Sequence, residues 1–316
     1  MKLLRFVNGK GPRMGVLEGD WIVPLDTLEA EYPTMLSIVA GGHDALSRVK
    51  SAVAVEKERI ALGEVRLLAP IEKPGKYLAI GMNFRKHAEE AKKLGVEPPS
   101  KQYWFNKQTS CLAGPHDDID PGVSEMLDYE VELCVVIGEP AKMVSAADAH
   151  KHVFGYTVAN DVTARDWQGH SPTFTVGKSF DTHGPIGPWI VTADEIANPH
   201  DLKLSCTVNG EVRQDSDTGQ LIHDIWAVRS REHRCDRKQG RRTGWVIATR
   251  SRRGSVQVVN PIMLLARPPS LGEGTGYIAL QRRSAFTISC SASMLDKIAD
   301  QVPSGNMPQL LGEPAG

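Results

Sequence analysis

The chain has 316 residues, of which 41% are hydrophobic and 24% are charged. These values are typical of a folded globular protein and exclude a disordered chain or a collagen-like repeat. The net charge of -1 argues against a nucleic-acid-binding protein, because such proteins carry an excess of positive charge.

The charge is distributed unevenly along the chain. Between Arg229 and Gly254 there are 10 basic and 2 acidic residues, which gives this segment a charge of +8. The rest of the chain carries a charge of -9. The near-neutral total is therefore a cancellation between an acidic protein and one basic segment.

The five cysteines are widely spaced, and no C-x-x-C pair occurs. This pattern argues against a disulfide framework and a zinc site, and it predicts a reducing, cytoplasmic location. No run of 18 apolar residues is present, so we expect no membrane-spanning helix.

Two domains are predicted, a small N-terminal domain over 1–70 and a catalytic domain over 71–316. The boundary lies in a proline-containing stretch, 69–75, where neither helix nor strand is favoured. Within the first domain we expect strands at 3–7 and 21–23, separated by glycine- and aspartate-rich turns.

The first predicted helix covers 35–55 and is interrupted at Gly41 and Gly42. In the second domain an apolar strand at 77–80 precedes a helix at 84–94. Further along the chain we expect two strands, at 129–137 and 154–162, and a hairpin at 204–214. The chain is predicted to be α+β, rich in strands, with short flanking helices.

Glu130 and Glu132 are the first candidates for a functional site. Residues two apart on a strand face the same side, so the two carboxylates lie together. Like charges so close repel each other unless they are protonated or bridged by a cation. The alternative is the solvated face of a half-buried edge strand, because charged residues are usually exposed.

Asp161 follows the strand predicted to end near it. It could act as the N-cap of a helix starting at 162–164. If it instead lies beside Glu130 and Glu132, the three carboxylates form an all-oxygen site. Such a site suits Mg²⁺, or another hard cation such as Mn²⁺ or Ca²⁺, and not zinc.

Other polar residues follow helical spacing. His87 and Glu90 are three residues apart, so a carboxylate could orient a histidine that serves as general base. The alternative is a polar surface helix. Arg165 and Gln168 have the same spacing. Lys178 lies in a Gly-Lys-Ser sequence that lacks the earlier glycine of a phosphate-binding loop.

Several segments, taken together and in this order, resemble the fumarylacetoacetate hydrolase family. The resemblance extends over roughly residues 70–228. The matching segments are 79–90, 128–133, 160–168, 177–182, 184–189 and 208–211. The resemblance implies a β-roll of mixed sheets with short flanking helices, a small N-terminal domain and a homodimer.

The resemblance also implies a role for each candidate residue. Mg²⁺ would be held by Glu130, Glu132 and Asp161. Catalysis would involve His87 as general base, Glu90 as its orienting partner, and Lys178. Substrate would contact Arg165, Gln168, Lys178 and Ser251.

The activity implied by the resemblance is Mg²⁺-dependent hydrolysis of a C–C bond in a 2-oxo acid, such as an acylpyruvate or fumarylpyruvate-like acid, in aromatic or other small-molecule catabolism. One alternative is isomerisation of 2-hydroxyhepta-2,4-diene-1,7-dioate or decarboxylation of 5-oxopent-3-ene-1,2,5-tricarboxylate or oxaloacetate. Another alternative is a catalytically impaired homologue that acts as a binding protein.

The resemblance weakens after residue 228. The family's Gly-Asp-Val-Ile-Ala-Thr-Gly-Thr-Pro loop corresponds to 244–252, where Arg250 replaces the glycine and Arg252 the proline. Strands are hard to find beyond Gly254. We consider three interpretations of this segment: an off-frame coding sequence, a degenerate C-terminus on a poorly active protein, or a basic arm for RNA or anionic surfaces.

Overall fold

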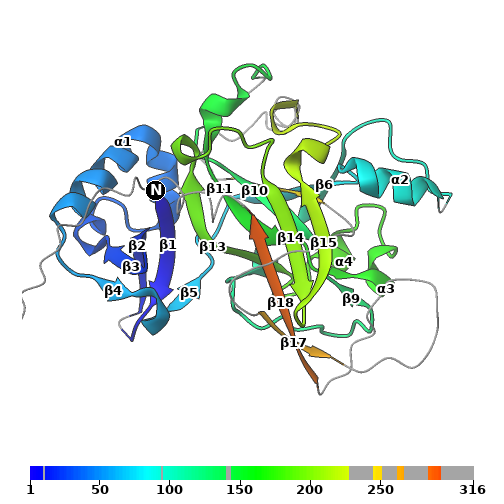
Figure 1. The fold of residues 1–316 in the computed structure, drawn as a ribbon, viewed down its shortest axis with the longest axis horizontal. Helices are drawn as coiled ribbons and strands as arrows, with labels where there is room; N and C mark the ends of the chain where they lie inside the picture. Colours follow the sequence, from blue (N-terminus) through cyan, green and yellow to red (C-terminus); the bar gives the residue numbers. More distant parts are fainter. Residues whose placement is uncertain are drawn as a thin grey trace, which may run out of the picture.

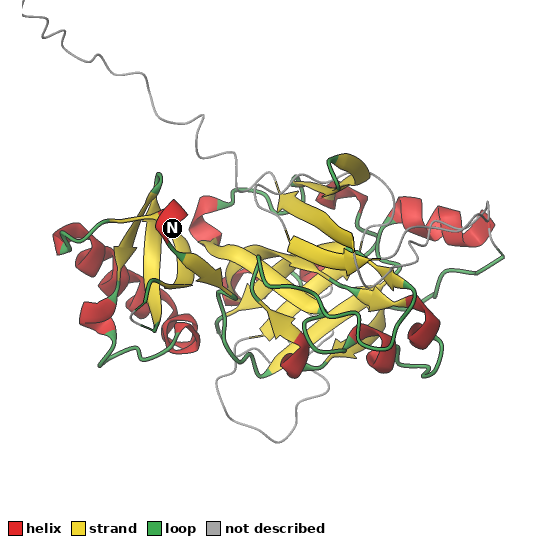
Figure 2. Cartoon of the chain, turned by 90° about the horizontal axis from the view of Figure 1, so that it is seen from below, coloured by secondary structure: helices red, strands yellow, loops and turns green. Residues whose placement is uncertain are grey.

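The structure is a computed structural model, and it describes the parts of the chain that follow: 1–9, 11–93, 95–139, 144–227, 245–250, 262–266 and 284–292. Side chains are described up to residue 227, except that of Glu90. Strands fill the centre of the molecule, and the helices lie around them (Figure 2).

A 12-stranded sheet forms the body of the protein. Its longest path runs β4-β3-β2-β1-β13-β11-β10-β16-β6-β7, with β5 added beside β1 and β8 beside β13. The pairings are antiparallel, except that β16 is parallel to β6 and β8 is parallel to β13. In chain order the strands are β1 Lys2–Val7, β2 Pro12–Glu18, β3 Trp21–Pro24, β4 Ile60–Ala61, β5 Arg66–Leu68, β6 Lys76–Gly81, β7 Tyr103–Lys107, β8 Leu112–Ala113, β10 Val131–Ile137, β11 Val153–Asn160, β13 Gly184–Thr192 and β16 Trp245–Arg250.

A second sheet of 4 strands has the order β15-β14-β18-β17. Apolar residues of β10, β11 and β14 belong to one core cluster, which lies between this sheet and the large one. Figure 1 shows β14, β15 and β18 crossing in front of β10 and β11. The strands are β14 Lys203–Val208, β15 Glu211–Asp217, β17 Ile262–Ala266 and β18 Ser284–Ala292, and a separate pair joins β9 Leu127–Asp128 to β12 Thr163–Ala164.

The strands β17 and β18 correct one expectation from the sequence. Strands were not apparent beyond Gly254, yet residues 288–292 of β18 pair with β14 and residues 284–288 pair with β17. These strands are identified by partners distant in sequence, which composition alone does not reveal. Of the basic segment over 229–254 the structure describes only 245–250, so Ser251, the predicted substrate contact, lies outside the described residues.

The helices are short apart from α1. In chain order they are α1 Met35–Val55, α2 Arg85–Lys93, α3 Arg165–Gln168 and α4 Thr175–Lys178, with 3₁₀ turns at Asp26–Leu28, Leu62–Glu64, Thr109–Cys111, Ala149–His152, Ala193–Glu195 and Thr218–Gln220. Within the described residues no helix is long and apolar enough to cross a bilayer.

The predicted interruption of the first helix is confirmed. Thr34 and Ser37 form a capping box that starts α1. At Gly42 the backbone has φ 56° and ψ -134°, and a Cβ built there would lie 2.6 Å from the Glu139 carboxylate. Only glycine fits this kink, because it alone tolerates both the positive φ and the close approach.

The predicted hairpin is confirmed as well. Asn209 and Gly210 join β14 to β15, with φ of 52° and 80°. Positive φ at both central residues is the geometry that Asn-Gly favours in a two-residue turn.

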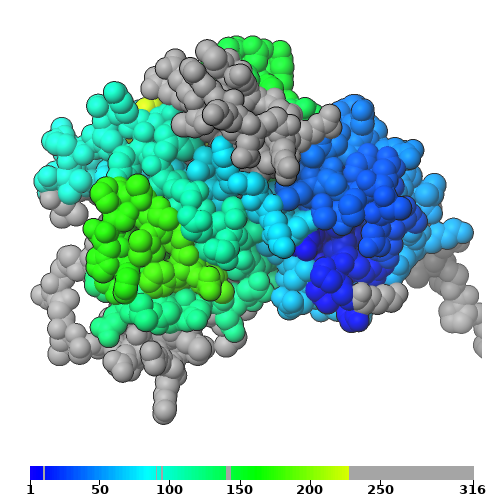
Figure 3. Space-filling model, turned by 180° about the vertical axis from the view of Figure 1, so that it is seen from behind, coloured from blue at the N-terminus to red at the C-terminus, as the bar shows by residue number. Residues whose placement is uncertain are grey.

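The N-terminal strands continue the large sheet. Lys2 and Leu3 of β1 pair with Val191 and Ile190 of β13. Figure 3 shows the first residues, in blue, as a lobe seated against the rest of the molecule. The division into domains at residue 70 stays a prediction, since backbone hydrogen bonds cross it.

Candidate active site

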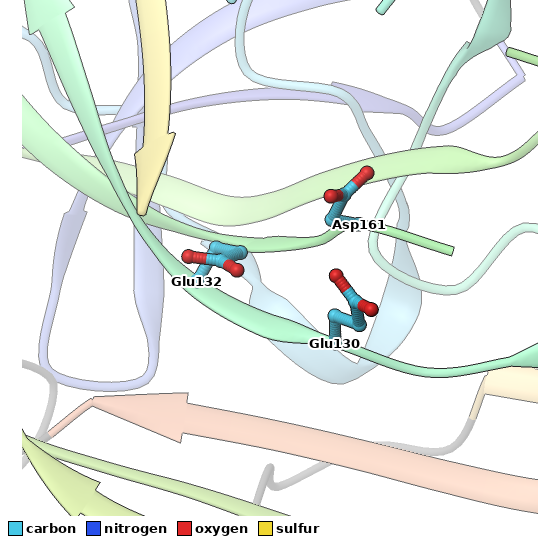
Figure 4. A group of neighbouring side chains, drawn as sticks. All are labelled: Glu130, Glu132 and Asp161. Atoms are coloured by element: carbon cyan, nitrogen blue, oxygen red, sulfur yellow. The ribbon is translucent and has the colours of Figure 1, made fainter. Parts of the chain in front are cut away.

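Three carboxylates meet where β10 begins and β11 ends. The two strands are antiparallel, and Val131 pairs with Asn160. The backbone N–H of Asp161 donates to the carbonyl of Glu130 at 2.7 Å, which fixes the two residues side by side. Glu132 lies two residues further along β10. Figure 4 shows the three side chains grouped together.

All three side chains are buried, with exposed fractions of 0% for Glu130, 1% for Glu132 and 0% for Asp161. One ligand oxygen from each lies within 4.8 Å of the others. Buried charges need a counter-charge, because a medium of low polarity does not screen their repulsion. Three carboxylate oxygens are ligands that suit a hard divalent cation.

The structure contradicts the alternatives considered for these residues. The strand β10 is buried along its whole length and lies between β11 and β16, so Glu132 is on neither an edge nor a half-buried strand. On the face that carries Glu132, Cys134 and Val136 belong to a buried core cluster with Ala79, Phe105 and Ala159, so this face is not left to solvent. Nor is Asp161 an N-cap, since α3 begins at Arg165 and its cap is Ala164.

Lys178 lies in the middle of this carboxylate cluster. Its ammonium donates to Glu130 at 2.7 Å and to Asp161 at 2.6 Å, and it is fully buried. It also lies 5.0 Å from the centre of the Phe105 ring. The residue predicted to be catalytic is therefore brought together with the predicted metal ligands.

Lys107 is a further buried cation, which the sequence reasoning missed. Its ammonium lies 2.7 Å from the second oxygen of Asp161, and it donates to the carbonyls of Val162 and Lys178. Its exposed fraction is 0%. One feature of the sequence could have identified it. Lys107 is the last residue of the aromatic strand β7 and lies on the same face as Phe105.

Arg165 holds the other side of Glu130. Its guanidinium pairs with Asp128 and Glu130 and donates to the Gln168 side chain at 2.8 Å. Burial would lower the pKa of Arg165, but the adjacent carboxylates of Glu130 and Asp128 outweigh it and raise that pKa. The substrate contacts predicted for Arg165 and Gln168 stay predictions.

Buried cations offset much of the negative charge of this cluster. Among the described residues the carboxylates are Asp128, Glu130, Glu132 and Asp161, and the cations paired with them are Lys107, Arg165 and Lys178. A divalent cation bound here would add positive charge, which favours an anionic substrate.

The helix carrying His87 is anchored at its N-terminal end. The Asn83 side chain accepts from the N–H of His223 at 2.8 Å and donates to its carbonyl at 3.0 Å. His87 is only 5% exposed, so it does not lie on a solvated surface, as the polar-helix alternative required. The side chain of Glu90 lies outside the described residues, and the pairing with His87 stays a prediction.

His183 is buried beside the cluster in its neutral form. One ring nitrogen lies 2.9 Å from the carbonyl of Asp120, so that nitrogen carries the proton and donates. Burial, followed by the charge of Lys107, lowers the pKa of His183 from 6.5 to about 4. The unfolded chain therefore binds more protons than the folded one between these pH values.

The free energy of unfolding should therefore decrease as the pH falls. The contribution of neutral His183 is complete above pH 6.5 and is lost as the pH falls toward 4, by about 3 kcal/mol in total. We expect His183→Gln to flatten the acid side of the stability curve measured by urea unfolding between pH 7.5 and 4.5. His43→Gln, at an exposed site, is the control. Parallel curves for wild type and His183→Gln would contradict this assignment.

Comparisons with known proteins show the family to which the chain is similar. The family model for the fumarylacetoacetate (FAA) hydrolase C-terminal domain matches residues 76–232, and the Rv2993c-like N-terminal model matches residues 1–70. The chain is 41% identical to oxaloacetate tautomerase FAHD2A, mitochondrial, of Bos taurus, over 70% of this chain and 72% of that protein.

The chain belongs to the fumarylacetoacetate hydrolase family. A Dictyostelium discoideum relative, fumarylacetoacetate hydrolase domain-containing protein 2 homolog, is 39% identical over 72% of this chain and 79% of its own length. The family resemblance read from the sequence is confirmed.

Solved structures of the family share the fold. The fumarylacetoacetate hydrolase of Exiguobacterium antarcticum has a TM-score of 0.69 and 29% identity, covering 92% of this chain and 95% of its own. Maleylpyruvate hydrolase from Sphingobium, in complex with manganese (II) ion and pyruvate, has a TM-score of 0.66 and 27% identity, covering 83% and 94%. The predicted strand-rich α+β fold of this family is confirmed.

Proposed function

We propose that this protein is a divalent-metal-dependent enzyme that interconverts the keto and enol forms of a 2-oxo acid of the oxaloacetate type. The observation that carries the proposal is the buried set of carboxylates Glu130, Glu132 and Asp161. Its support from relatives is the tautomerase name of the 41% identical bovine protein.

The donor set fits a hard cation, and the residues that would hold it are Glu130, Glu132 and Asp161. Mg²⁺ is the expected ion, and a related hydrolase structure contains manganese (II). A bound divalent cation would supply Lewis-acid stabilisation of the negative charge that develops on the 2-oxo oxygen.

Residues of the chain would supply the other catalytic groups, a hydrogen-bond donor and a proton acceptor. The Lys178 ammonium is placed to donate a hydrogen bond to an oxygen that gains negative charge. From keto to enol, His87 would accept a proton from the carbon next to the 2-oxo group, and the 2-oxo oxygen would gain a proton; in the reverse direction the oxygen loses its proton and His87 gives one to the carbon. Burial of both side chains keeps competing water away from the transferred proton.

A second candidate is hydrolysis of a C–C bond in an acylpyruvate-like acid. It is supported by the maleylpyruvate hydrolase among the similar structures. In this reaction His87 would remove a proton from the attacking water. The divalent cation and Lys178 would again stabilise the negative charge that develops on oxygen. Isomerase and decarboxylase activities share this requirement for stabilised negative charge.

Ultraviolet assays on two substrates test the proposal. With Mg²⁺ or Mn²⁺ we expect loss of the enol absorbance of oxaloacetate to accelerate by about 100-fold or more over the same protein in EDTA. Faster loss of acetylpyruvate absorbance than of oxaloacetate enol would instead favour the hydrolase. Glu125→Gln, at an exposed carboxylate, should behave as wild type.

Turnover of neither substrate, in protein that binds the metal, would favour the remaining alternative of a catalytically impaired binding protein. The homodimer and the cytoplasmic location expected from the sequence stay predictions.

A further inference from the structure

The segment 221–227 lies beside both ends of the stretch of chain that carries α2. Before α2, Asn83 forms three hydrogen bonds with the backbone of residues 222–223, the shortest at 2.7 Å. After α2, the Gln102 side chain donates to the carbonyl of Ala227 at 3.3 Å. Figure 1 shows α2, in cyan, standing out from the body of the molecule. The chain therefore leaves for α2 and returns from it beside one segment.

A histidine from another part of the chain holds this segment. The Nε2 atom of His200 accepts a hydrogen bond from the Ile225 N–H at 3.1 Å. The carboxylate of Asp224 accepts from the Ala227 N–H at 2.7 Å. Both N–H groups lie at the start of a helical turn, where the backbone offers them no acceptor. The His200 and Asp224 side chains therefore fix the backbone of this turn.

The bond to Ile225 requires a neutral His200 ring. A ring nitrogen accepts only while it carries no proton, so the proton of the neutral ring is on Nδ1. Burial lowers the pKa of His200 from 6.5 and outweighs the carboxylate of Asp224, which raises it. The ring is therefore mostly neutral near pH 7. Trp226 packs edge-on against the same ring, with 5.3 Å between the ring centroids.

The stretch of chain that carries His200 also holds the other end of the segment. Leu202 and Thr218 form two hydrogen bonds, each 2.9 Å long, and the Leu221 N–H donates to the Thr218 carbonyl at 3.3 Å. Phe84, the residue before α2, pairs with Leu221 in an isolated bridge. The segment is thus fixed at both ends, and it in turn fixes the start of α2.

We propose that His200 is a positioning residue for His87, which acts through its hydrogen bond to the backbone of Ile225. His87 lies in the first turn of α2, close to Asn83, and is only 5% exposed. A general base must stay within hydrogen-bond distance of the proton that it takes, and a displacement of about 1 Å can lower a rate about 100-fold. The inference rests on the proposed function, because it takes His87 as the proton acceptor.

Two substitutions separate the hydrogen bond from the packing of the ring. His200→Phe keeps a ring against Trp226 but has no acceptor, whereas the amide oxygen of His200→Gln can take the place of Nε2. For His200→Phe we expect kcat on oxaloacetate to fall about tenfold, with KM and Mn²⁺ affinity within about twofold of wild type. His200→Gln should keep kcat within about threefold of wild type.

Hydrogen exchange, followed by mass spectrometry, reads the position of α2 without turnover. In His200→Phe the amides of α2 and of the 221–227 segment should exchange about fivefold faster than in wild type, because one hydrogen bond that holds the segment is lost. In His200→Gln their exchange should stay within about twofold of wild type.

His150 provides a matched control. It is exposed and lies against the same tryptophan, with 6.1 Å between the ring centroids of His150 and Trp226. His150→Phe should therefore leave both kcat and the exchange of α2 unchanged. Thermal melting of each variant checks that the fold is retained.

Two results would overturn the inference while the proposed function stands. One is equal kcat and equal exchange in wild type and His200→Phe. The other is an equal loss in His200→Phe and His200→Gln, since restoring an acceptor would then have no effect. Turnover of neither oxaloacetate nor acetylpyruvate by the wild type would instead reject the proposed function. The exchange rates alone would then confirm or reject the link between His200 and α2.

Discussion

Replacement of Glu130 by glutamine is expected to weaken Mn²⁺ binding by at least about 100-fold, because the site loses one of three charged ligands. It should also destabilise the fold. Glu130 is the shared partner of Lys178 and Arg165, and each of these buried cations would lose one counter-charge. We expect a loss of about 3 kcal/mol in the free energy of unfolding in EDTA.

Isothermal titration with Mn²⁺ and urea unfolding measure these two effects separately. Glu125→Gln removes the same charge at an exposed position and serves as the matched control. Unchanged Mn²⁺ affinity in Glu130→Gln would remove Glu130 from the metal site. Unchanged stability would show that Lys178 and Arg165 are satisfied by Asp161 and Asp128 alone.

Replacement of Lys107 by methionine should be among the most destabilising single changes in the described part of the chain. Lys107 is fully buried, 2.7 Å from Asp161, and it also donates to two backbone carbonyls. Methionine matches its length but leaves these acceptors without their donor. We expect a loss of about 3–5 kcal/mol in the free energy of unfolding.

The chain contains a well-matched control for this prediction. Lys151 pairs with Asp148 at the same 2.7 Å, but its side chain is 64% exposed. Lys151→Met should change the free energy of unfolding by at most about 0.5 kcal/mol, because water already solvates both charges. Urea unfolding of the two variants therefore compares a buried ion pair with an exposed one of the same length. Similar losses for both would show that the pairing in the interior is not what stabilises this site.

The sequence predicted the composition of the site better than its surroundings. The two-residue spacing of Glu130 and Glu132 indicated a shared face, whereas the place of Asp161 beside them was implied only by the family resemblance. Alternation along one strand cannot show what covers its outer face, however. The solvated edge strand stayed an alternative until β10 was seen to lie between β11 and β16, with Cys134 and Val136 buried on the face that carries Glu132.

Partners distant in sequence account for what could not be predicted. Lys107 comes from a strand 54 residues before Asp161, and a single lysine at the end of a strand has no periodic signature. The strands β17 and β18 were not predicted because the sequence around them shows no clear alternation of apolar and polar residues. They are recognised by their pairing with each other and with β14. Local features such as the kink at Gly42 and the Asn209-Gly210 turn were predicted because glycine determines backbone geometry directly.

The place of β16 has a consequence for how the chain folds during synthesis. Tyr77 and Val246 are paired, although 169 residues separate them along the chain. Until β16 leaves the ribosome, β6 and β10 both present an unpaired edge, and the large sheet is divided between them. Such edges pair readily with other chains, and contacts of high sequence separation form late. The nascent protein is therefore expected to depend on chaperones until residues 245–250 have been made.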